Sequence, residues 1–77
     1  MANNGYMSTF VQKVRTADQS KIGVQLGVMC IDKDIPVTDV SDFFKVSRMT
    51  VYSWFTGKTN VPKAHHEKMS KLVEKLQ

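Results

Sequence analysis

Residues 37–58 read VTDVSDFFKVSRMTVYSWFTGK, and the spacing of their apolar positions predicts two short helices. The first covers 37–44 and the second about 47–56. Ser47 carries the side-chain oxygen that an N-cap needs, and Gly57 is the residue type that most easily adopts the left-handed conformation that ends a helix. The two helices are therefore joined by a turn of about three or four residues.

Three further helices are predicted, two before this unit and one after it, because apolar residues recur there at helical intervals. We find no convincing strand-like alternation of apolar and polar residues. The two glycines four apart in 22–31 lower helix propensity by about 1 kcal/mol each, but they allow close approach of a neighbour. We predict an all-α fold, a compact bundle of about five helices. The flanking helices are expected at Ser8 to Ala17, from an N-cap at about Ser20 to Asp32 or Lys33, and from about Asn60 to the end, with Pro62 in the first turn.

The length and composition fit one small domain over residues 1–77, with 42% hydrophobic residues to form a single core. Residues 1–7 are expected to be flexible. Phe43, Phe44 and Trp54 are assigned to the core from their helical phase, although Trp54 also has the ring that base stacking would use.

The cysteine count and apolar runs indicate a protein of the cytoplasm. A single cysteine, Cys30, excludes an internal disulfide and is compatible with a reducing compartment, and we interpret it as a buried thiol. The apolar run 22–31 is about half the length needed to cross a bilayer. The first ten residues lack the basic start and apolar stretch of a signal peptide.

Positive charge is concentrated in the second part of the chain. Residues 1–44 contain four Lys or Arg and five Asp, whereas residues 45–77 contain seven Lys or Arg and two Glu. This asymmetry indicates a polyanionic partner on one side of the molecule, although solubility alone also produces such a distribution.

The 37–58 stretch resembles the helix-turn-helix of the phage repressor and Cro-type family, which is lambda-repressor-like and whose usual wording is close to T-Q-x-x-L-A-x-x-L-G-V-S-x-x-T-I-x-x-W-x-x-G-K. Val46–Ser47 stands at Val-Ser, Thr50–Val51 at Thr-Ile, and Trp54 and Gly57–Lys58 match directly. The resemblance covers 22 of the 77 residues, and it places the helix-turn-helix at about 37–57. It implies a sequence-specific, double-stranded-DNA-binding transcriptional regulator, a repressor of phage or prophage or Cro type. Such a protein would act in the cytoplasm of a bacterial cell or phage-infected host, where it would be nucleoid-associated when bound.

Three positions depart from the family wording. Val37 stands where a DNA-contacting glutamine is expected. Lys45 stands at the turn glycine, so it would need a left-handed conformation at a cost of about 1 kcal/mol unless the turn is built differently. Phe55 occupies a position that is commonly polar, so we expect it either to pack on the last helix or to contact a partner chain.

Four residues of helix 47–56 are candidates for reading bases. Because residues near the start of a recognition helix enter the major groove first, Arg48 and Met49 are best placed for base edges. Ser53 lies one turn later, with Tyr52 near the groove wall. For Arg48, a phosphate contact and a solvated surface charge are the alternatives.

A second set of residues suits contacts to the DNA backbone. Hydroxyl, amide and ammonium groups and helix-start N–H groups donate to phosphate oxygens. For each lysine the alternative is a merely solvated charge. The set consists of Lys45, Ser47, Thr50, Lys58, Thr59, Asn60 and Lys63.

The expected assembly is a homodimer on double-stranded DNA, because half-sites one helical turn apart call for two copies. The contact is expected from Leu72, Val73 and Leu76 of the last helix or from Phe55, with packing inside the monomer as the alternative. No membrane partner and no small-molecule ligand are expected.

An alternative function is a protein–protein interaction module, such as an antitoxin or a host-factor binder, on the same helical fold. Its contact surface would be Phe55 and the terminal helix. His65 and His66 are adjacent and point about 100° apart on a helix, so we expect no metal site. No catalytic residues and no cofactor are expected, since Cys30 lies on an apolar face without a recognisable partner.

Overall fold

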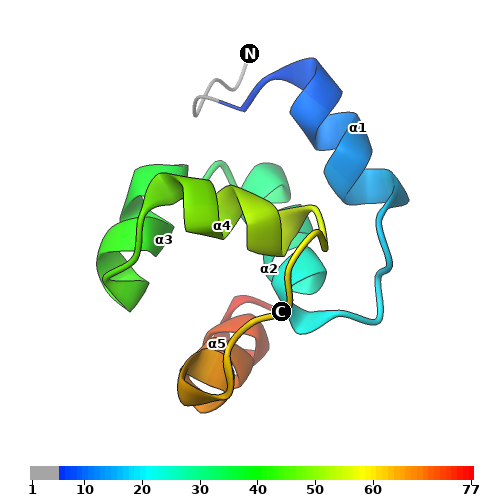
Figure 1. The fold of residues 1–77 in the computed structure, drawn as a ribbon. Coiled ribbons are helices and arrows are strands. Elements are labelled where there is room, and N and C mark those ends of the chain that lie inside the picture. Colours follow the sequence, from blue (N-terminus) through cyan, green and yellow to red (C-terminus); the bar gives the residue numbers. More distant parts are fainter. Residues whose placement is uncertain (1–5) are drawn as a thin grey trace.

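Residues 6–77, which the computed structural model describes, form five α-helices and no strand (Figure 1). The prediction of an all-α fold is therefore confirmed. Of the segment 1–7 that was expected to be flexible, residues 1–5 lie outside the described residues. The helices are α1 Ser8–Thr16, α2 Ile22–Asp32, α3 Val37–Phe44, α4 Arg48–Phe55 and α5 Lys63–Leu76.

The starts of α2 and α5 differ from the predictions. Ser20 was predicted to cap α2, but the N-cap is Lys21, without a side-chain cap bond. The reason is that the Asp18 carboxylate accepts hydrogen bonds from both the Ser20 backbone N–H (3.0 Å) and its hydroxyl (2.6 Å). These bonds lower the pKa of the Asp18 carboxyl. Pro62 is the N-cap of α5 rather than a first-turn residue.

Helix α2 lies at the centre and packs against α1, α4 and α5 (Figure 1). Its glycines make the contact with α4 close, as predicted. A Cβ atom at Gly23 would lie 2.8 Å from the Trp54 carbonyl oxygen, and one at Gly27 would lie 2.8 Å from Phe55 Cγ. Because both residues lack a side chain, the backbone of α4 can pack close to that of α2.

The turn between α3 and α4 contains a non-glycine residue in the left-handed conformation. Lys45 has φ 58° and ψ 46°. Its N–H donates to the Asp42 carbonyl (3.3 Å), and the Val46 N–H donates to the Ser41 carbonyl (3.0 Å). This pair of bonds is the Schellman arrangement that ends a helix, so of the two alternatives for the turn, the one with a left-handed Lys45 is found.

Two aromatic residues lie elsewhere than predicted. Phe55, for which packing on the last helix and contact with a partner chain were the alternatives, is fully buried: its ring is 6.4 Å from Tyr6 and 6.5 Å from Phe10, and it lies against Gly27 of α2. Phe43 was assigned to the core but is 45% exposed. Its ring packs on the edge of the Phe44 ring, with the Lys68 ammonium 4.4 Å from its centre. Trp54 and Phe44 are buried as predicted.

Candidate nucleic-acid interface

Helix α4 has one buried side and one exposed side. Val51 and Trp54 point into the core together with Phe55. The start of the helix is held by Ser47, whose Oγ accepts a hydrogen bond from the Thr50 N–H (3.1 Å) and lies 3.0 Å from the Thr50 hydroxyl. Because the buried side chains and the cap fix the helix axis, the direction of the exposed side is also fixed.

The four candidate base-reading residues lie on that exposed side but differ in accessibility. Arg48 is exposed, and Met49 is 75% exposed. Tyr52 and Ser53 are half-buried, since the Tyr52 ring packs edge-on against the Phe10 ring of α1 at 4.9 Å. Contact with α1 thus covers part of the second turn of α4 and leaves the first turn open.

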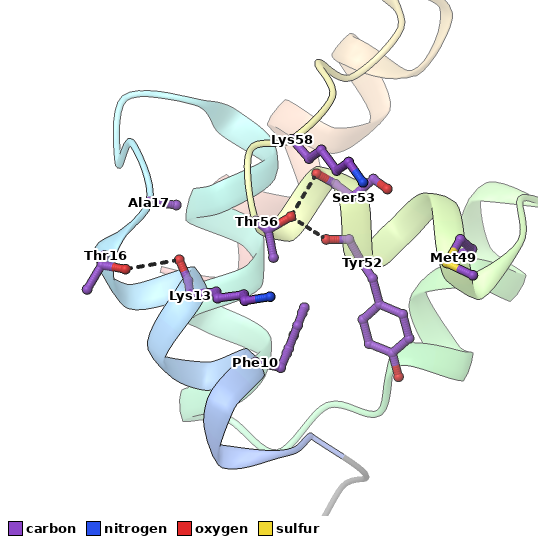
Figure 2. A pocket seen from close by; sticks show the side chains of 9 residues that line it. All are labelled: Phe10, Lys13, Thr16, Ala17, Met49, Tyr52, Ser53, Thr56 and Lys58. Atoms are coloured by element: carbon purple, nitrogen blue, oxygen red, sulfur yellow. Dashed lines mark hydrogen bonds between the residues drawn. The ribbon is translucent and has the colours of Figure 1, made fainter.

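An open groove of about 470 Å³ runs between α1 and α4 (Figure 2). Three of the four candidate base-reading residues, Met49, Tyr52 and Ser53, line the α4 side of the groove. Lys58 lines it as well. The α1 side was not predicted, because only the packing of two helices that are distant in sequence brings those residues beside α4. The groove is lined by Phe10, Lys13, Thr16, Ala17, Met49, Tyr52, Ser53, Thr56 and Lys58.

The candidate phosphate-binding residues do not form one cluster. Thr59 and Asn60 border a separate hollow of about 370 Å³ beside the start of α2, and Lys58 borders the α1–α4 groove. Lys63 is the first residue of α5. The remaining three, Lys45, Ser47 and Thr50, lie together at the start of α4.

Five of the described cations have no internal partner. In the part of the chain that the structure describes, the side chains of Lys13, Lys45, Arg48, Lys58 and Lys63 form no ion pair and no hydrogen bond.

Other cations are engaged within the protein. Arg15 pairs with Asp32 at 2.7 Å, and Lys21 donates to the Gly57 carbonyl at 3.1 Å. Lys68 donates to the Phe43 carbonyl at 2.7 Å. The positive charges beside α4 are thus available to an external anion without breaking an internal contact.

The predicted dimer contacts are largely occupied within the monomer. Val73 and Phe55 belong to the buried core, so for these two residues the alternative of packing inside the monomer is the one that the structure shows. Leu72 and Leu76 are half-buried and border a small hollow with Phe43.

Cys30 and His65, two other residues considered for chemistry, pack against core side chains. Burial raises the pKa of the Cys30 thiol to about 12, which keeps it protonated. The His65 ring packs 5.7 Å from that of Phe44 and 5.6 Å from that of Trp54. No group of three or more His, Cys, Asp or Glu within residues 6–77 has the arrangement of a metal site. Over the same residues, no helix is both long and apolar enough to span a bilayer.

Comparisons with known proteins give no relative from which function can be transferred. No family model, curated protein or solved structure matches this chain. Functional inference therefore starts from the sequence resemblance and from the geometry of α4.

Proposed function

We propose that this protein is a sequence-specific transcriptional regulator that binds double-stranded DNA and reads the major groove with the exposed side of α4. In the resembled family this role is that of a repressor of phage or Cro type, acting in the cytoplasm. The observation that carries the proposal is a capped helix whose opposite side is locked in the core, with Arg48 and Met49 exposed at its first turn. Recognition requires a helix of this kind, held rigidly and open at its start.

The contacts follow from the chemistry of the exposed residues. The Arg48 guanidinium can donate two hydrogen bonds to the O6 and N7 atoms of a guanine, which discriminates between bases by about 1–3 kcal/mol. The Met49 thioether chain offers an apolar surface to a thymine methyl group. Lys45, at the turn before α4, is positioned for a phosphate that flanks the groove. In this proposal Arg48 gives specificity and the lysines give affinity.

The proposed binding unit on DNA is a homodimer, because one copy presents a single eight-residue reading helix. The buried Phe55 and Val73 do not supply the contact between the two copies.

Fluorescence anisotropy with random-sequence duplex DNA at two salt concentrations tests the proposal. We expect binding that weakens steeply as salt increases. On a site selected from a random oligonucleotide pool, we expect Arg48→Ala to bind at least tenfold more weakly than the wild-type protein. Lys75→Ala is the matched control, because it also removes one exposed cation but from the far end of α5. Absence of salt-dependent binding, or equal effects of the two variants, would rule out this reading.

A second candidate function is a protein-binding module, and the exposed Phe43 favours it. Phe43 borders a hollow of about 160 Å³ with Leu72 and Leu76, and this hollow can accept an apolar side chain of a partner. The same anisotropy experiment separates the two functions, because a module of this kind has no reason to bind duplex DNA in an Arg48-dependent manner.

A further inference from the structure

We infer that α1 belongs to the DNA-binding surface, and that the groove between α1 and α4 holds the sugar-phosphate backbone of one strand between Lys13 and Lys58. This inference rests on the proposed function and extends it to a helix outside the stretch that resembles the phage repressor family. It assigns Lys13 a role that its position in the sequence did not suggest.

The first step is that α1 is fixed beside α4. The Phe10 ring packs edge-on against Tyr52 at 4.9 Å and stacks on Tyr6 at 5.7 Å. The Tyr6 hydroxyl donates to the Ile35 carbonyl at 2.9 Å, which ties the start of α1 to the segment between α2 and α3. Since Val14 is fully buried as well, the groove has two rigid walls.

The second step concerns position. A recognition helix that lies in the major groove has a phosphate backbone on each side of it, because that groove is only about 12 Å wide. The groove lies beside α4 and opens to solvent, so one phosphate backbone of the duplex is expected to lie in it. Figure 2 shows the Lys13 side chain extending from α1 toward α4, into the groove that Ser53 and Lys58 also line.

The groove carries positive charge and an unengaged hydroxyl donor. The residues that line the groove include two lysines and no Asp or Glu. The Ser53 hydroxyl forms no hydrogen bond with any described residue, so it can donate to a phosphate oxygen. The hydroxyls of Thr16 and Thr56 instead donate to carbonyls of their own helices. The groove thus offers Lys13, Lys58 and Ser53 as its donors to an anion.

Salt titration of binding to a nonspecific duplex tests the inference. Each neutralised phosphate contributes about 0.9 to the slope of log K against log salt concentration. We expect Lys13→Ala to reduce that slope by about one, and Lys13→Arg to restore it. Lys75→Ala should leave the slope unchanged. Circular dichroism of each variant checks that the exposed substitution preserves the helices.

The outcomes distinguish this inference from the proposed function. If the wild-type protein binds DNA in an Arg48-dependent manner but Lys13→Ala has the wild-type slope, the role of α1 is overturned and the function of α4 stands. If the wild-type protein shows no salt-dependent binding, both are overturned. A reduced slope for Lys13→Ala with an unchanged slope for Lys75→Ala supports the inference.

Discussion

Lys45 combines a strained backbone with a proposed phosphate contact. Its φ of 58° costs a residue with a side chain about 1 kcal/mol, a cost that glycine avoids. Because glycine also gains freedom in the unfolded chain, we expect Lys45→Gly to raise the free energy of unfolding by only about 0.5 kcal/mol. The same change should weaken DNA binding. Urea unfolding and anisotropy measure the two effects.

Lys45→Ala is the matched variant, since it removes the charge and keeps the strained backbone. It should weaken DNA binding as much as Lys45→Gly does, without the gain in stability. If both variants bound DNA like the wild-type protein, Lys45 would be only a turn residue.

Cys30 makes stability depend on pH in the alkaline range. Burial raises the pKa of its thiol from 9.0 to about 12, so the native state retains the proton more tightly than the unfolded state. The corresponding stability is fully present below pH 9 and is lost as pH rises from 9 to 12. Urea unfolding of the wild-type protein and of Cys30→Ala across this range should give curves that converge as pH rises. Parallel curves would contradict this account of the thiol.

The start of α4 depends on one capping side chain. Ser47 Oγ accepts the Thr50 N–H at 3.1 Å, and loss of such a cap typically costs about 1 kcal/mol. We expect Ser47→Ala to lower the free energy of unfolding by that amount and to weaken DNA binding through fraying of the first turn. Ser70→Ala, an exposed substitution inside α5, is the control and should change stability by less than about 0.5 kcal/mol.

The contact between α2 and α4 depends on a missing side chain. A Cβ at Gly23 would lie 2.8 Å from the backbone oxygen of Trp54, which cannot move without shifting α4. Although alanine favours a helix by about 1 kcal/mol over glycine, we expect Gly23→Ala to destabilise the protein by about 1–3 kcal/mol net. Thermal unfolding measures this, and a variant as stable as the wild-type protein would show that the two helices can separate at little cost.

Local chemistry determined which elements could be predicted from the sequence. The bounds of α3 and the Ser47 cap were predicted because they depend on neighbouring residues. The Ser20 cap was not, because the hydroxyl is engaged by Asp18 two residues earlier. The burial of Phe55 depends on the packing of α1 and α2, which adjacent sequence does not encode. For the same reason the α1 side of the candidate site, with Lys13, could not be predicted.

At the scale of the whole molecule, charge and packing are divided between two regions. Helix α2 packs against the buried side of α4. Four cations without internal partners lie on α4 or on the segments beside it: Lys13, Lys45, Arg48 and Lys58. Lys68, Lys71 and Lys75 of α5 instead border a separate hollow with Phe43 and Leu72. A duplex is therefore expected to contact the α1–α4 region and to leave the exposed side of α5 in solvent.

Amide chemical-shift mapping of the ¹⁵N-labelled protein, titrated at low salt with a nonspecific duplex, tests this expectation most directly. We expect shift changes concentrated at residues 45–53 and at Lys13 and Lys58, which disappear when salt is added. Residues 67–76 of α5 should change little. Shift changes confined to α5, or none in the 45–53 segment, would contradict the claim that α4 is the DNA-reading helix.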